Sequence, residues 1–344
     1  MDTTIVLFLL QDGVLNGAIY ALVAVALVLV FAVTRVILFP QGEFVAFGAL
    51  TLAALEEGRA PGTIGLLICL GLATALLELW RNRKDLSVRR LRGIVGLDLL
   101  LPCVVGLLAW WLAPRELPVL ADVALTIALV APIGVYIYRM AFQPLAEASI
   151  LVLLITAVGV HLALLGLGLV FFGPEGYQTR PLSDAVMSTG VLTITGQSIA
   201  IVAVAAALML LLYLFFEKTL AGKALIAVAV NRIGARLVGI PSWLAGNAAF
   251  AMAALIGVVS GVLISPVTTI YYDTGFLIGL KGFIAAILGG LASYPVTVAA
   301  ALGVGLIEAF ASFWQSAYKE AIVFTLIIPV LLWRSLRDPG HDEE

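Results

Sequence analysis

Residues 14–50 read VLNGAIYALVAVALVLVFAVTRVILFPQGEFVAFGAL, and this stretch decides the fold. Its first part, residues 14–34, is an apolar run near the ~20 residues that a helix needs to cross ~30 Å of hydrocarbon. A Pro-Gln-Gly-Glu sequence at 40–43 then interrupts the apolar character. Such a break is tolerated in a membrane only where protein or a wet cavity satisfies the freed backbone groups. We therefore expect a membrane helix followed by an interrupted entry of the next segment; a simple cytoplasmic turn is the alternative.

The rest of the chain has the same apolar character. Of its 344 residues, 62% are hydrophobic and 12% are charged, whereas soluble domains carry roughly 25% charged residues. A lipid-facing chain must satisfy its own backbone, and the period-two alternation of membrane strands is absent, so helices are the expected spanning element. The sequence thus predicts an all-α polytopic membrane protein. No basic tract suggests a nucleic-acid partner.

Length and polarity predict about eleven membrane or re-entrant segments, with nine as the lower bound. They lie at 14–34, 42–57, 62–80, 94–112, 119–138, 148–172, 197–216, 244–264, 275–292, 295–312 and 319–333. The segments that begin at 42, 275, 295 and 319 have 15 to 18 residues. Because that length is near the lower limit of a full span, we expect some of them to be re-entrant or broken.

The distribution of basic residues predicts the orientation. With the N-terminus outside, fourteen of the nineteen Lys and Arg residues fall on one side, including the loop 81–92 and the segment 217–242. The positive-inside rule makes that side cytoplasmic, so we expect an N-out, C-in topology. An even number of spans, from one miscounted segment, is the alternative.

A weak internal repeat relates the two halves. NGAIYALVAVALVLV from Asn16 and NAAFAMAALIGVVSGVLI from Asn247 begin alike, and each leads about 27 residues later to a step that ends in Phe, at 43–44 and 275–276. The predicted topology runs the copies in opposite directions, which is the inverted-repeat arrangement of many transporters. Chance similarity between two Ala/Val/Leu-rich helices is the alternative.

Few polar residues lie inside the apolar runs, where a charge at a helix centre costs about 2.5 to 3.5 kcal/mol on insertion scales. Lys281 and Glu308 fall at similar depths in neighbouring segments, so we expect a structural ion pair, with substrate contact as the alternative. His161 is expected to be packed or hydrogen-bonded rather than a ligand. Cys69 and Cys103 lie in apolar runs and are expected to be core residues rather than a disulfide or a metal pair.

Residues 217–242, EKTLAGKALIAVAVNRIGARLVGIPS, predict a short amphipathic element outside the membrane. Its pattern resembles the cytoplasmic coupling loop of the permease subunits of branched-chain amino acid ABC importers, the Liv-type H subunit family. In this resemblance the loop passes movement from the ATPases to the permease. The residues that carry it, and that it implies as the ATPase-coupling positions, are Thr219, Gly222, Ala224, Ala227, Asn231, Ala235, Leu237, Gly239 and Ile240.

The resemblance covers most of the chain. DGVLNGAIYALVAVALVLVF at 12–31, GEF at 42–44, RMAFQPL at 139–145 and GFLIGLKGFIAAILGGL at 275–291 are similar to successive motifs of the family. Three departures stand out. Residues 38–41 read LFPQ where the family commonly has Asn-Phe-Ala-His, Ile226 and Val230 replace residues that are often charged, and residues 80–118 look like an insertion of two helices with a packing or lipid-contacting role.

The resemblance implies one permease domain over residues 1–344, in a bacterial-type inner membrane, that imports branched-chain or related small amino acids. It also implies a second homologous permease, two cytoplasmic ATPases and an extracytoplasmic substrate-binding protein. Because no G-x-x-x-x-G-K-[ST] loop occurs, ATP and Mg would bind to the ATPases, and the chain itself is expected to hold no cofactor, metal or catalytic residue.

A substrate path between the two permeases would use the few polar residues near the apolar helices. The candidates for it are Asn16, Gln41, Glu43 and Thr156. Urea, short amides and aromatic acids are alternative cargos. A secondary transporter driven by an ion gradient is an alternative function, and a membrane-embedded enzyme would require Glu308, His161 and Gln315 to converge on one cavity.

Overall fold

The computed structural model describes residues 3–81, 83, 88–115, 117–183, 185–189, 192–325, 328–330 and 332. Most of these residues are helical, and eight helices among them are long and apolar enough to cross a membrane. One antiparallel hairpin, β1 (Val186–Thr189) with β2 (Leu192–Thr195), was not expected from the sequence. The chain is therefore a polytopic helical membrane protein with one small strand pair.

Each of the eleven predicted segments coincides with a helix, although the last one, 319–333, lies partly outside the described residues. In chain order the helices are α1 (Thr3–Thr34), α2 (Gln41–Glu56), α3 (Thr63–Arg81), α4 (Val88–Ile94), α5 (Leu101–Leu112), α6 (Val119–Ile137), α7 (Ile150–Phe172), α8 (Gly196–Lys218), α9 (Leu220–Val230), α10 (Arg232–Leu237), α11 (Ser242–Ile264), α12 (Thr274–Leu288), α13 (Tyr294–Gln315) and α14 (Lys319–Thr325). Short π-helical or 3-10 turns lie at Val95–Leu100, Tyr138–Phe142, Gln143–Leu145 and Ser316–Tyr318.

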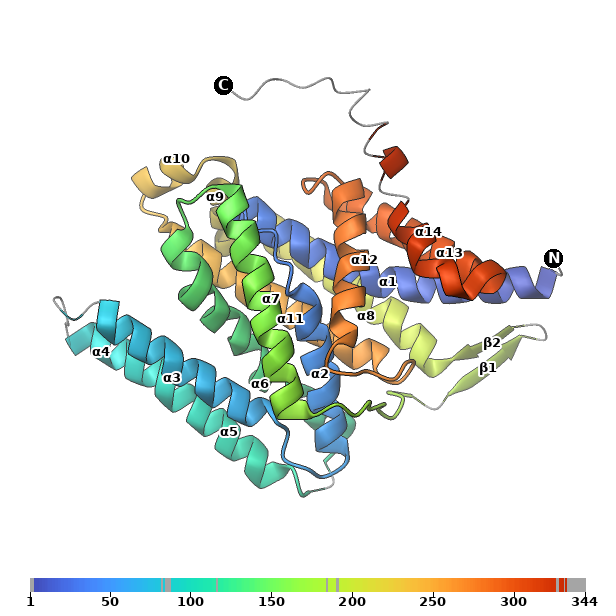
Figure 1. Cartoon of the computed structure of the whole chain (residues 1–344), viewed down its shortest axis with the longest axis horizontal. Helices are drawn as coiled ribbons and strands as arrows, with labels where there is room; N and C mark the ends of the chain where they lie inside the picture. The colour runs from blue at the N-terminus through green and yellow to red at the C-terminus, as the bar shows by residue number, and fades with distance from the viewer. Residues whose placement is uncertain are drawn as a thin grey trace.

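The region 80–118 was predicted to be an insertion of two helices, and that role stays a prediction. Its described part contains one helix of membrane-spanning length, Leu91–Leu112. α4, the π-helical turn at 95–100 and α5 follow one another without a break and form this helical run. This run lies beside α3 at one edge of the molecule (Figure 1).

The first helix, α1, lies in the core and packs against α8, α11, α12 and α13. Its glycines allow this approach: a Cβ on Gly17 would lie 2.8 Å from the Cα of Leu302 in α13, and a Cβ on Gly305 would overlap the backbone of Gly13 and Gly17. In lipid, close packing between small residues replaces the hydrophobic drive for helix association. The Gly13-x-x-x-Gly17 pattern therefore places α1 directly on α13.

The break after α1 is irregular backbone enclosed by the protein. Leu38 and Gln41 are fully buried, and the Gln41 N–H donates to the Leu38 carbonyl oxygen at 3.1 Å. α2 begins there, beside the start of α12. At this point Gly42 and Gly275 are in backbone contact, because a Cβ on either would overlap the carbonyl oxygen of the other. The structure thus contains the enclosed break rather than a solvent-exposed turn.

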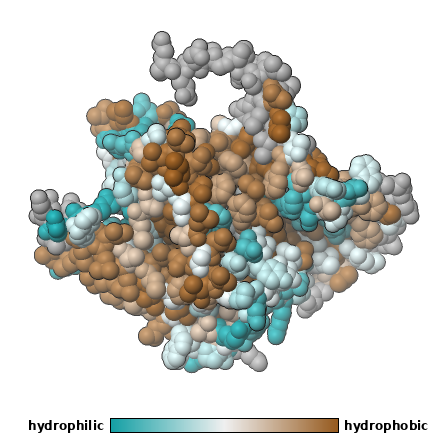
Figure 2. Space-filling view, in the orientation of Figure 1, coloured by the Kyte–Doolittle hydropathy of each residue, from teal (hydrophilic) through white to brown (hydrophobic). Residues whose placement is uncertain are grey.

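The helices at the edge present apolar surface to the outside. Figure 2 shows a broad hydrophobic surface over the side where α3 and α5 lie. Cys69 on α3 and Cys103 on α5 are free and exposed on these helices, so the prediction that they are core residues is wrong. The physical reason is that an apolar run in a membrane protein faces lipid as readily as it faces protein.

Candidate functional site

A buried polar contact joins the first turn of α2 to the middle of α7. Glu43 Oε1 lies 2.5 Å from His161 Nδ1, and both side chains are almost completely buried. The His161 ring stacks on Phe276 with 4.9 Å between the ring centroids, and Phe39 meets it edge-on at 5.6 Å. His161 is therefore hydrogen-bonded within an aromatic cage. Its partner is 118 residues away in sequence, and no pattern in the sequence links the two.

A second buried polar cluster joins α1, α12, α13 and α14. Lys281 Nζ lies 2.5 Å from Glu308 Oε1 and 3.2 Å from Glu320 Oε1. The Tyr20 hydroxyl donates to Glu308 Oε2 at 2.6 Å, so both carboxylate oxygens of Glu308 have partners. The structure brings Lys281 and Glu308 together. Sequence reasoning missed Tyr20 and Glu320. Tyr20 could have been found, because a tyrosine hydroxyl inside an apolar helix needs a hydrogen-bond partner.

The four path candidates lie on three helices, α1, α2 and α7. Gln41 is fully buried, and its Nε2 donates to the Ala253 carbonyl oxygen in α11 at 2.9 Å. Glu43 faces His161, as described above. Asn16 is half-buried on α1, and Thr156 is half-buried on α7. In this structure Gln41 and Glu43 therefore join helices inside the protein.

The two polar clusters are separate from one another. His161 contacts Glu43, whereas Glu308 contacts Lys281 and Tyr20. Gln315 is an exposed residue at the end of α13. Glu308, His161 and Gln315 therefore do not converge on one cavity, as a membrane-embedded catalytic centre would require.

α9 and α10 form a bent element between α8 and α11, and specific residues set its bends. Thr219 Oγ1 accepts from the Gly222 N–H at 2.9 Å, and Asn231 Oδ1 accepts from the Gly234 N–H at 2.8 Å. These are N-cap bonds that satisfy the free N–H groups of a helix start. A Cβ on Gly222 would overlap the carbonyl oxygen of Phe215, so glycine is needed where α9 turns back against α8.

The end of α10 is a tight turn that requires glycine. Gly239 has a φ of +86°, which L side chains rarely adopt. The Ile240 N–H donates to the Ala235 carbonyl oxygen at 2.9 Å, and the Gly239 N–H donates to the Arg236 carbonyl oxygen at 3.1 Å. This bond pair is a Schellman motif. The turn directs the chain through Pro241 into α11.

The two arginines of α10 bond to the turn that leads into α7. Arg232 Nη1 donates to the Ala146 carbonyl oxygen at 2.6 Å, and Arg236 Nη1 lies 3.0 Å from Glu147 Oε1 in an exposed ion pair. Both arginines therefore connect α10 to the body of the protein.

The outer face of α9 and α10 is apolar. Five large side chains on it are 74–89% exposed: Leu220, Val230, Ile233, Leu237 and Val238. Several large apolar side chains exposed on one short element make it a candidate interaction surface. We call these five residues the outer apolar face. Sequence reasoning included Leu237 alone; the four-residue spacing of Ile233 and Leu237 was the signal for Ile233.

The nine predicted coupling residues divide between the faces of this element. Gly222 and Ala235 are buried against the body of the protein. The others are half-buried or exposed: Thr219, Ala224, Ala227 and Ile240 are half-buried, and Asn231, Leu237 and Gly239 are exposed. Several of them thus set the shape of the element, whereas Leu237 lies on its outer surface.

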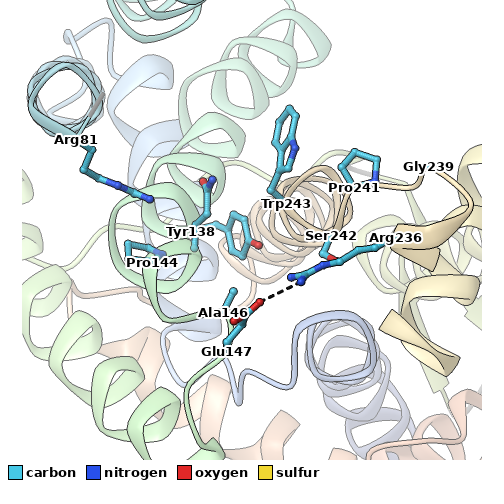
Figure 3. Close-up of a pocket in the computed structure, with 11 residues that line it drawn as sticks. Arg81, Tyr138, Pro144, Ala146, Glu147, Arg236, Gly239, Pro241, Ser242 and Trp243 are labelled. Carbon is cyan, nitrogen blue, oxygen red and sulfur yellow. Dashed lines mark hydrogen bonds and ion pairs between the residues drawn. The ribbon is translucent and has the colours of Figure 1, made fainter. Parts of the chain in front are cut away.

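A hollow of about 600 Å³ opens beside α10, between the end of α3, the turn after α6 and the start of α11 (Figure 3). Arg81 reaches toward it from α3, and Arg236 reaches toward it from α10. Tyr138 lies between the two guanidinium groups in this view, and Trp243 lies to one side of them. The hollow therefore combines cationic and aromatic side chains at one end of the helical body.

The fold and this site define a class: a multi-pass helical membrane protein in which a short capped helical element, α9 and α10, exposes large apolar side chains. The family model described as branched-chain amino acid transport system / permease component matches residues 9–331. Because this match covers nearly the whole chain, the protein belongs to that permease family. The family supplies the permease component of ABC transporters, which is not itself catalytic.

Two bacterial relatives show the extent of the similarity. The chain is 27% identical over 347 residues to the high-affinity branched-chain amino acid transport system permease protein BraD of Pseudomonas aeruginosa, covering 97% of this chain and 95% of the relative. It is 26% identical over 328 residues to the corresponding permease protein LivH of Escherichia coli K12, covering 93% and 91%. The similarity to these inner-membrane permeases agrees with the multiple spanning helices of the structure.

Proposed function

We propose that this chain is the permease subunit of an ATP-driven importer for branched-chain or related small amino acids. The outer apolar face on α9 and α10 carries the proposal, since it is a ready docking surface on an element tied to the helical body by Arg232 and Arg236. Family membership supports the ABC mechanism. Urea, short amides or aromatic acids are the alternative cargos within it.

The partners follow from this mechanism. A second homologous permease would complete the path. Two cytoplasmic ATPases would dock on the permeases, one on the outer apolar face of each. An extracytoplasmic binding protein would deliver the substrate. ATP and Mg would bind to the ATPases. Closure of the ATPases would push on residues 217–242, and the capped ends of α9 and α10 would pass that movement to α8 and α11 as rigid bodies.

We infer an N-out, C-in orientation and an inverted repeat that relates α1, α2 and α6 to α11, α12 and α13. The packing supports this relation because equivalent helices make equivalent contacts. α1 packs on α13 and α12, and its counterpart α11 packs on their counterparts, α6 and α2. The short helices α2 and α12 meet at their second residues, Gly42 and Gly275. A pseudo-two-fold axis would pass near that contact, where transporter sites are expected.

The substrate path is proposed to involve Asn16, Gln41, Glu43 and Thr156. Gln41 Oε1 and Glu43 Oε2 support this, since both are buried acceptors without a hydrogen-bond partner in the described part of the chain. A buried acceptor without a partner costs about 1 to 3 kcal/mol, so a change of conformation that exposes it to a ligand or water would recover that cost. Lys281 and Glu308 are proposed to hold helices together rather than to bind substrate.

The experiment is co-purification in mild detergent of the permease with its ATPase, followed by reconstitution and uptake of radiolabelled leucine. Leu237→Asp places a charge on the outer apolar face at a position that is 83% exposed, so the fold has no reason to change. Val88→Asp, at a 68% exposed position at the start of α4, is the matched control. We expect Leu237→Asp to lose the ATPase and the uptake, and the control to retain both.

Two outcomes would overturn the proposal. Uptake that continues under ATP depletion and stops when the ion gradient is collapsed would establish a secondary transporter instead. Uptake that is competed by urea, amides or aromatic acids but not by valine or isoleucine would keep the ABC mechanism and replace the cargo.

A further inference from the structure

The hollow beside α10 has a surplus of positive charge. Arg236 is engaged by Glu147 at 3.0 Å through Nη1 and donates through Nε to Ser242 Oγ at 3.0 Å. Arg81 has no hydrogen bond or ion pair within the described part of the chain. Glu147 is the acid that lines the hollow. Two guanidinium groups therefore face one carboxylate, and the Nη2 of Arg236 is not used by either of its partners.

Apolar side chains continue from the hollow on both sides. On α3, Leu76 and Trp80 precede Arg81 and are 67% and 68% exposed. On α11, Trp243 and Leu244 begin the helix and are 52% and 54% exposed. Both helices run from the hollow into the apolar body, and tryptophan is the residue enriched where hydrocarbon meets headgroups. The hollow thus lies where a polar headgroup and apolar chains would be held by one surface.

We propose that this hollow binds the headgroup of an anionic phospholipid from the cytoplasmic leaflet, with Arg81 and Arg236 as the cationic residues of its lining. Guanidinium groups match phosphate oxygens in a two-pronged geometry. Basic pockets between membrane helices on the cytoplasmic side suit such headgroups. The acyl chains would lie over the exposed apolar residues of α3 and α11.

Because the hollow lies against α10, a bound lipid would affect how α10 is held against the rest of the permease. Arg236 and Gly239 belong to α10 and its terminal turn, and both line the hollow. A bound headgroup would therefore hold α10 against the ends of α3 and α6, in addition to the contact with Glu147. An effect of the lipid on coupling rests on the proposed N-out, C-in orientation and on the proposed coupling role of α9 and α10. Binding of the lipid rests on the proposed orientation only.

The test uses the purified full-length permease in nanodiscs of phosphatidylcholine, with or without phosphatidylglycerol, and native mass spectrometry of the lipid retained after release into detergent. Arg81→Gln removes the guanidinium that has no partner among the described residues. Arg83→Gln makes the same change two residues later, at a position that does not line the hollow. We expect retention of phosphatidylglycerol to fall about fivefold in Arg81→Gln, as one arginine near a charged headgroup contributes about 1 kcal/mol, and to be unchanged in Arg83→Gln.

The remaining outcomes overturn the proposal. Equal loss in both variants would mean general surface charge rather than a site. Displacement of the lipid by inorganic phosphate, with the same dependence on Arg81, would assign the site to a soluble anion. Unchanged lipid retention with loss of the co-purifying ATPase would make the hollow an ATPase contact. Since lipid retention is measured on the permease alone, its failure leaves the proposed transport function untouched, and failure of leucine uptake leaves the lipid result untouched.

Discussion

The first helix and the eighth are similarly apolar but occupy opposite places in the molecule. In α1, 89% of the most apolar stretch is buried inside the protein, whereas in α8 the share is 11%. A soluble protein could not hold α8 in this position, because its apolar surface would face water. In a membrane the hydrophobic effect places both helices in the bilayer and does not decide which of them faces lipid.

Two features distinguish α1 from α8: glycines that let its backbone pack closely on another helix, and a buried polar side chain that bonds to a neighbouring helix. α1 carries Gly13 and Gly17 against α13, and Tyr20 hydrogen-bonds to Glu308. α8 has its single glycine at Gly196, in its first turn, and no polar side chain between Ser198 and Glu217 apart from Tyr213. Contacts of this kind fix a membrane helix in a core, and the following predictions test whether they do so here.

The largest effect is expected at the glycine contact of α1. Gly305→Leu would place a side chain into the backbone of Gly13 and Gly17, which leaves no space for it. We expect no monodisperse protein by fluorescence-detected size-exclusion chromatography. Gly159→Leu, on α7 where a Cβ meets nothing within 4 Å, should give a normal elution profile. Normal folding of Gly305→Leu would show that α1 is not closely packed on α13.

The second effect concerns the buried polar cluster around Glu308. Lys281→Met leaves the buried Glu308 and the partly exposed Glu320 without their cation, and loss of one partner of a buried pair costs about 3 to 5 kcal/mol. We expect a large fall in the denaturation midpoint, measured by SDS titration in mixed micelles. The double variant Lys281→Met with Glu308→Leu should recover much of the loss. If the double variant is no more stable than the single one, the cluster does not act as an ion pair.

A smaller effect is expected from identical substitutions in the two helices. Ala24 in α1 is fully buried, whereas Ala206 in α8 is exposed. Ala24→Leu overfills the core and should cost about 1 to 3 kcal/mol, and Ala206→Leu should stay within about 0.5 kcal/mol of the parent. The same SDS titration compares them. Equal destabilisation would remove the distinction between the inner and the outer helix.

The smallest effect is expected at an exposed ion pair. Glu147→Gln removes the partner of Arg236, and the two side chains are 78% and 46% exposed. Exposed pairs contribute about 0 to 1 kcal/mol, so the midpoint should barely move, and it should move less at high salt. A loss comparable to that of Lys281→Met would mean that α10 is held by this pair far more tightly than its exposure indicates.

The sequence predicted the helices because length and polarity determine them, and it predicted the family because motifs spread from residue 12 to residue 291 lie in the family's order. It did not predict how the helices meet. Glu43 and His161 lie on different helices, so only the folded chain shows that they touch. Cys69 and Cys103 were misplaced since apolar runs do not distinguish lipid from core. The outer position Ile233 shares a helical spacing with Leu237, but its role as surface followed only once its exposure was known.

The outer apolar face of α9 and α10 is proposed to bind a protein, whereas the apolar face of α8 is expected to meet lipid. Cysteine accessibility tests it directly, with Leu237→Cys and Leu210→Cys each in a Cys69→Ser, Cys103→Ser background. A membrane-impermeant maleimide is applied to inside-out vesicles with and without the partner ATPase. We predict that residue 237 is labelled when the ATPase is absent and protected when it is present, and that residue 210 is never labelled. Equal labelling of residue 237 in both conditions, or none in either, would contradict the account.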